Sequence, residues 1–142
     1  MENFIVKYIF FGILLQAVFI TAKLPDFITP DMVAMVADDK AKCMGLHGTT
    51  EALIDQVNEG TIVNDRAITC YMHCLFETFG VIDEDGELEV EMLVGMFPES
   101  IQDAGRELFN KCASQTGSDD CDKVFNIAKC VQQTRPDMWF MI

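Results

Sequence analysis

Two cysteines and a histidine lie in one short stretch of the sequence, ITCYMHCLFE at residues 68–77. Residues of these types at close spacing can ligate a metal, carry out redox chemistry or form disulfides. A structural zinc site needs four ligands, usually in two close pairs, and the cysteines after residue 74 form no such pair. On a helix His73 would point about 100° away from Cys74. Redox motifs have a Cys-x-x-Cys spacing, one residue shorter than that of Cys70 and Cys74. We therefore expect structural disulfides, and no metal or other cofactor.

The N-terminal segment, MENFIVKYIFFGILLQAVFITA at residues 1–22, has the layout of a secretory signal peptide. One basic residue, Lys7, precedes an apolar run, and the small residue Ala22 lies where a cleavage site would fall. The alternative is a membrane anchor, but the apolar run is shorter than the roughly 20 residues of a comfortable span. We expect a secreted, extracellular protein with one mature domain, residues 23–142.

The cysteines all fall within this mature domain, and an even number in a small secreted protein indicates a disulfide framework. Residues 67–80 read as a helix, on which Cys70 and Cys74 lie one turn apart on the same face. A disulfide between these two would break the helix, so each is expected to join a different segment. The other pairings stay open at this point. The cysteines are Cys43, Cys70, Cys74, Cys112, Cys121 and Cys130.

The formal net charge of −13 argues against nucleic-acid binding, because an acidic surface repels phosphate. The most acidic turn, around residues 83–87, was compared with a calcium-binding EF-hand loop. If Gly86 takes the sixth position, Val81 and Met92 take the first and twelfth, where acidic oxygen ligands are required. The segment is therefore interpreted as a solvated turn.

Helical periodicity runs through the mature domain, and no alternating segment rich in Val, Ile and Thr predicts a strand. The fold class is therefore expected to be all-α. In the clearest helix, residues 67–80, apolar side chains recur on one face at the spacing of helical turns. Thr29 and Ser118 are expected to cap the first and last helices. The expected helices span residues 30 to 45 or 48, 50–60, 67–80, 87–97, 98–112 and 118–134.

The chain ends in four large apolar residues, WFMI at 139–142, which would be a liability in water unless they were buried. A tail that folds back into a helical body needs space there, and a cavity could provide it. The chain is also rich in methionine, which suits surfaces that adapt to different apolar shapes. Ordinary core packing explains each such residue singly. Together with the expected disulfides, the tail favours a cavity of which it forms a wall or a lid.

The cysteine spacing C-x26-C-x3-C-x37-C-x8-C-x8-C resembles the six-cysteine signature of insect odorant-binding proteins. The stretches DKAKCM, HGTT, ITCYMHC, GSDDCDKVFNIAKCVQ and PDMWFMI are similar to pheromone-binding proteins of bees, wasps and ants. The resemblance covers the whole mature domain. It implies a six-helix fold around an apolar cavity, with the disulfides Cys43–Cys74, Cys70–Cys121 and Cys112–Cys130.

The resemblance also implies a function, which is to carry small apolar volatile odorants or pheromones through the aqueous lymph around sensory neurons. Further expected partners are an olfactory receptor or another membrane protein, and the carrier is expected to be a monomer or a weak homodimer. The implied ligand-binding residues are Phe27, Met32, Met35, Val36, Tyr71, Met72, Leu75, Phe76, Phe79, Met96, Phe97, Phe125, Trp139, Phe140 and Ile142.

Many members of this family release their ligand on acidification, through contacts of the C-terminal tail with a carboxyl group or a histidine. Here the second expected helix ends in QVNEG, where the amide Asn58 stands at a plausible position for such a contact. An amide does not titrate, so a pH-dependent switch would fall to Glu59, His47, His73 or the terminal carboxylate. Release on acidification is kept as a hypothesis.

Two other classes of function were weighed. A small secreted hydrolase would need a histidine paired with an acid, plus a nucleophile or a calcium loop, and the sequence shows no such set. We therefore expect no enzymatic activity. A disulfide-linked interaction domain, recognised by a protein receptor, would suit the acidic surface and an exposed apolar tail.

Overall fold

The computed structural model describes residues 24–142, so the expected signal peptide and its cleavage site lie outside the described residues. Within this part the regular elements are all α-helices, and Ile82 and Leu88 form an isolated antiparallel bridge. None of the described helices is both long enough and apolar enough to cross a membrane. The helices are α1 (Pro30–Met35), α2 (Ala37–His47), α3 (Glu51–Asn58), α4 (Arg66–Thr78), α5 (Val90–Gly95), α6 (Glu99–Cys112) and α7 (Asp120–Thr134).

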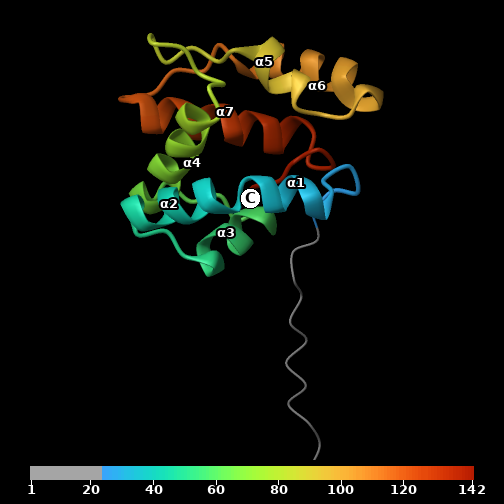
Figure 1. The fold of residues 1–142 in the computed structure, drawn as a ribbon. Helices are drawn as coiled ribbons and strands as arrows, with labels where there is room; N and C mark the ends of the chain where they lie inside the picture. Colours follow the sequence, from blue (N-terminus) through green and yellow to red (C-terminus); the bar gives the residue numbers. More distant parts are fainter. Residues whose placement is uncertain (1–23) are drawn as a thin grey trace, which may run out of the picture.

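The helices are arranged around α7, which runs through the middle of the molecule (Figure 1). In this view α5 and α6 lie on one side of α7, and α1, α2 and α3 lie on the other. The main helix contacts are those of α4 with α7 and α2, and those of α6 with α5 and α7. The chain after α7 then returns to the interior, so that the C-terminus lies near the centre of the picture.

The first expected helix is two helices, which corrects the expected count of six to seven among the described residues. Val36 separates α1 from α2, with φ −103° and ψ 5°, outside the α-helical region. Thr29 caps α1 as expected, because its side chain accepts a hydrogen bond from the backbone N–H of Met32 at 3.2 Å. After this break α2 packs against α4, and in Figure 1 α1 lies beside α2 on the same side of α7.

Side chains also cap or stabilise the starts of other helices, and the sequence predicts some of these contacts correctly. Asp119, rather than Ser118, caps α7, since its carboxylate accepts from the backbone N–H of Asp122 at 2.9 Å. A carboxylate at this position also complements the helix dipole. The acidic turn before α5 is held by Asp83, whose carboxylate accepts from two backbone N–H groups of the same turn at 2.8 and 2.9 Å.

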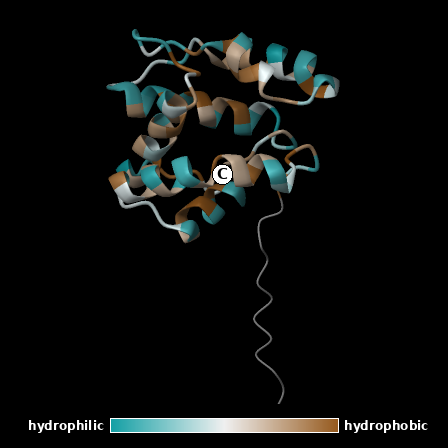
Figure 2. Cartoon of the chain, in the orientation of Figure 1, coloured by the Kyte–Doolittle hydropathy of each residue, from teal (hydrophilic) through white to brown (hydrophobic). Residues whose placement is uncertain are grey.

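Three disulfides tie the helices together with the pairing that the family resemblance implies. Cys43–Cys74 joins α2 to α4, Cys70–Cys121 joins α4 to α7, and Cys112–Cys130 joins α6 to α7. The two cysteines of α4 therefore bind two different neighbours. Figure 2 shows hydrophobic and hydrophilic residues alternating along the helices, as expected for helices that bury one face.

We expect opposite effects from two Gly→Ala substitutions in one helix. Gly48 ends α2 with φ +67°, where a Cβ atom is strained, so G48A should lower the free energy of unfolding by about 1 kcal/mol. Gly45 lies inside α2, and a Cβ there would meet no atom within 4 Å. G45A should therefore raise that free energy by about 0.5 kcal/mol. Urea denaturation of the oxidised protein measures both, and equal effects of the two substitutions would contradict the prediction.

Candidate functional site

An apolar cavity of about 600 Å³ opens among the helices and the C-terminal segment. Its wall contains side chains of α1, α4, α5, α6 and α7, and also residues 138–142, which follow the last helix. Every wall side chain is hydrocarbon or thioether except that of Trp139, whose indole nitrogen is the one polar side-chain atom other than sulfur. The size and the apolar wall are those of a site for a small molecule.

Most of the residues that the resemblance implied as ligand-binding lie in this wall. They come from α1, from α4, from the turn between α5 and α6, and from the tail, and the fold brings them together around one space. Their contact with a ligand stays a prediction. These residues are Met32, Met35, Val36, Met72, Leu75, Phe76, Phe79, Met96, Phe97, Trp139, Phe140 and Ile142.

Three of the implied residues do not line the cavity. Phe27 lies in an aromatic cluster beside the wall, with its ring edge-on to Phe97 at 6.0 Å and to Phe140 at 5.8 Å between centroids. Tyr71 is fully buried in the core and binds the tail through its hydroxyl group. Phe125 is 5% exposed and packs in the main core cluster. Apolar periodicity marks a side chain as buried, but it does not say whether the buried side faces a cavity or other side chains.

Other wall residues were not singled out from the sequence. Ala128 and Val131 lie on the expected apolar face of α7, so periodicity identifies them as buried and nothing more. Val81 and Pro98 lie in turns, where no periodic pattern applies. The wall residues missed in this way are Ile28, Val33, Val81, Leu93, Pro98, Phe109, Ala128, Val131, Met138 and Met141.

The tail is held in place by hydrogen bonds to α3. Asn58, the last residue of α3, donates from Nδ2 to the carbonyl oxygen of Met141 at 2.7 Å. Its Oδ1 accepts from the backbone N–H of Met141 at 2.6 Å. One residue away, the carbonyl oxygen of Val57 accepts from Trp139 Nε1 at 3.1 Å. We call the two bonds between Asn58 and Met141 the amide clasp.

A buried hydroxyl group fixes the last residue. Tyr71 of α4 donates its hydroxyl hydrogen to a main-chain oxygen of Ile142, the last residue of the sequence, at 2.5 Å. Burial raises the pKa of the Tyr71 phenol, and the negative charge of Glu51 raises this pKa further. The phenol therefore stays protonated and remains a donor at every physiological pH. Neither donor side chain, the Asn58 amide or the Tyr71 phenol, titrates near neutrality.

The histidines lie away from the cavity wall. His73 faces Glu77 on α4, with 3.5 Å between Nδ1 and Oε2, and His47 lies in the last turn of α2. In residues 24–142 no group of three or more His, Cys, Asp or Glu side chains is placed to hold a metal ion.

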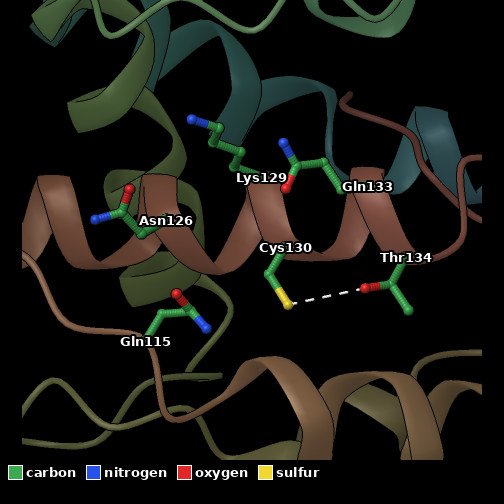
Figure 3. A pocket seen from close by; sticks show the side chains of 6 residues that line it. All are labelled: Gln115, Asn126, Lys129, Cys130, Gln133 and Thr134. Carbon is green, nitrogen blue, oxygen red and sulfur yellow. Dashed lines mark hydrogen bonds between the residues drawn. The ribbon is translucent and has the colours of Figure 1, made fainter.

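A second depression, of about 320 Å³, is lined mainly by polar side chains of α7 (Figure 3). Lys129 and Gln133 point to one side of α7, and Cys130 and Thr134 point to the other. The Cys130 sulfur lies 4.0 Å from the Thr134 hydroxyl oxygen and is bonded to Cys112 in a disulfide. This depression offers no enclosed apolar surface and no free thiol.

An all-helical, disulfide-linked body with one apolar cavity defines a class of small-molecule carriers. The sequence matches the PBP/GOBP family over residues 26–134, and the chain belongs to that family. The resemblance found in the sequence is thus confirmed, together with the all-α fold. Members of this family bind odorants as carriers and are not enzymes, so the chain is not expected to have a catalytic site.

A relative in Drosophila melanogaster supports this assignment, and solved structures from other insects share the fold. The chain is 30% identical to general odorant-binding protein 69a of Drosophila melanogaster over 104 residues, which are 72% of this chain and 70% of that protein. Odorant binding protein 5 of Apis mellifera superposes with a TM-score of 0.71 at 21% identity, over 81% of this chain and 98% of the other. Odorant binding protein 7 of Anopheles gambiae, solved with an azo compound, has the same TM-score at 21% identity, over 81% and 99%.

We expect the amide clasp to control the exposure of the tail. N58A removes both bonds to Met141, so Trp139 should become more accessible to solvent, with a red-shifted emission and about twofold stronger quenching by acrylamide. Trp139 is the only tryptophan, so the signal reports on the tail alone. Q56A removes an exposed amide from the same helix and should change neither quantity. Equal spectra for N58A and the unchanged protein would show that the clasp does not hold the tail.

Proposed function

We propose that the protein binds small hydrophobic odorants or pheromones in its apolar cavity and carries them through aqueous lymph toward olfactory receptors. The observation that carries the proposal is the cavity of about 600 Å³ with a predominantly apolar wall. Two further findings support it, the odorant-binding relatives and the Anopheles gambiae relative that was solved with a small organic molecule.

The energy of such binding comes from removing apolar surface from water. A ligand that buries about 300 Å² of apolar surface gains about 7.5 kcal/mol at 25 cal/mol per Å². Burial of the facing wall adds to this gain, and lost translational and rotational freedom subtracts from it. Micromolar dissociation constants correspond to about 8 kcal/mol. Affinity in this range suits a carrier, which must both load and unload.

The proposal also covers the secretion and the location of the protein. We propose that residues 1–22 direct secretion and are removed, and that residues 23–142 form the carrier in sensillar lymph or another body fluid. The formal charge of −13 keeps a concentrated extracellular carrier soluble. The tail is engaged inside the molecule, with Met141 only 6% exposed, so it is not offered to a protein receptor as the interaction-domain alternative would need.

Release on acidification remains a hypothesis, but none of the three side chains that bind the tail is a carboxylate or a histidine. The tail is bound by an amide, an indole and a phenol. The charged pair before it, Arg135 and Asp137, lies 2.7 Å apart, and the guanidinium lowers the pKa of the Asp137 carboxyl. Asp137 therefore stays ionised down to a pH below its ordinary range. The contribution of the Arg135–Asp137 pair to the free energy of unfolding is therefore lost only when Asp137 is protonated below that range, and not between pH 7 and pH 5.

We expect a substitution that fills the cavity to weaken binding. Val33 lines the cavity from α1 and is partly exposed, so V33F can place a ring in the cavity without rebuilding the core. The affinity for an apolar fluorescent probe such as 1-aminoanthracene should fall about tenfold, which corresponds to about 1.4 kcal/mol. V63F makes the same change at an exposed site outside the cavity and should leave the affinity unchanged. Failure of the unchanged protein to bind any apolar probe would refute the proposed function.

We expect the probe affinity of the unchanged protein to be equal at pH 7 and pH 5, because the amide, the indole and the phenol that bind the tail keep the same protonation state in this interval. N58D should introduce a pH dependence. At pH 7 the new carboxylate would repel the Met141 carbonyl oxygen, and on protonation it could donate to that oxygen again. Probe binding by N58D should thus be weaker at pH 7 than at pH 5. A loss of affinity at pH 5 in the unchanged protein would support an acid-triggered release.

A further inference from the structure

We propose that the cavity selects uncharged ligands and discriminates against free carboxylic acids of the same chain length. This inference rests on the proposed function and specifies the chemical class of its ligand. A carboxylate that leaves water needs a cationic partner or several hydrogen-bond donors. No side chain of the wall is a Lys, Arg, His, Ser, Thr, Tyr, Asn or Gln.

The polar groups nearest to the wall are already engaged with the protein itself. Trp139 Nε1 donates to the carbonyl oxygen of Val57. The amide of Asn58 donates one N–H to the Met141 carbonyl oxygen and accepts from the Met141 N–H. The Tyr71 hydroxyl group donates to Ile142. A ligand head group could take one of these bonded hydrogens only by breaking a bond that holds the tail.

A long ligand could avoid this cost by leaving its head group in water at the cavity mouth. The mouth is marked by wall residues that are also exposed, and Met35 and Met96 are 76% and 44% exposed. These two residues come from α1 and from the turn after α5, and we infer that the mouth lies near them. The binding free energy of a carboxylate placed there would depend on the charges that border the mouth.

The bordering segments are acidic and contain no lysine or arginine. This holds for residues 24–39, for residues 88–99 and for residues 136–142, each of which contains at least one Asp or Glu. Two arginines reach these segments from other positions, and both are already paired. Arg106 contacts Glu91 at 2.8 Å, and Arg135 contacts Asp137 at 2.7 Å. Within these described segments a carboxylate therefore finds no lysine or arginine of the segment itself, and it meets acidic neighbours there.

The test is competition for the bound probe at pH 7.5 by a C12 fatty acid and by its methyl ester. The two compounds have the same chain, so they differ chiefly in charge. The ester should displace the probe at a concentration at least about tenfold lower than the acid, which corresponds to about 1.4 kcal/mol. If the probe binds and the acid competes as well as the ester, the inference is wrong while the proposed function stands. If the probe does not bind, the proposed function itself has failed.

A positive charge at the mouth should reduce the difference in affinity between the fatty acid and its methyl ester. M96R places a guanidinium at an exposed wall position, and the acid should gain about fivefold relative to the ester, as expected for a partly exposed ion pair. M92R adds the same charge on α5 at a residue that is 57% exposed and outside the wall, and it should leave the ratio unchanged. If M96R binds the ester but leaves the ratio of acid to ester affinity unchanged, the lack of a positive charge at the mouth is not the cause of the discrimination.

Discussion

The amide clasp between Asn58 and the backbone of Met141 is the interaction on which the cavity depends. Residues 138–142 supply a continuous part of the wall, and the clasp holds them there together with the bonds of Trp139 to Val57 and of Tyr71 to Ile142. One side chain at the end of α3 satisfies both the donor and the acceptor of a single backbone residue. This two-way bond fixes the position and the direction of the tail, which apolar packing alone does not specify.

A cavity of this size removes packing energy that a domain of about 120 residues can hardly spare. The disulfides offset this loss, since each typically contributes about 2–4 kcal/mol. Their placement also matters, because α4 is bonded to both α2 and α7, and α6 is bonded to α7. The helices around the cavity are thus held covalently where the missing core cannot hold them by contact.

The sequence predicted the helices and the tail well, because amphipathic periodicity and capping are local properties. The break at Val36 was not predicted, because it depends on the neighbours of each half of the segment. The second half, α2, packs against α4, and the first half, α1, lines the cavity. The family resemblance placed Phe27, Tyr71 and Phe125 in the cavity wall, and they do not line it. A pattern of buried residues could not correct this, because it does not show where the core ends and empty space begins. Asn58 stood out in the sequence as an amide where an acid could serve, yet its bonds to Met141 depend on the path of the returning chain.

The cavity wall is assembled from segments between residue 28 and residue 142, so no partly folded form of the chain contains it. A ligand can therefore bind only the native state and must raise its stability by RT ln(1 + [L]/Kd). At a ligand concentration of about 100 Kd this amounts to about 2.7 kcal/mol. Unfolding exposes a chain to proteases, and the loaded protein unfolds less often. Occupied copies should then outlive empty ones, and the supply of ligand would set how much carrier persists.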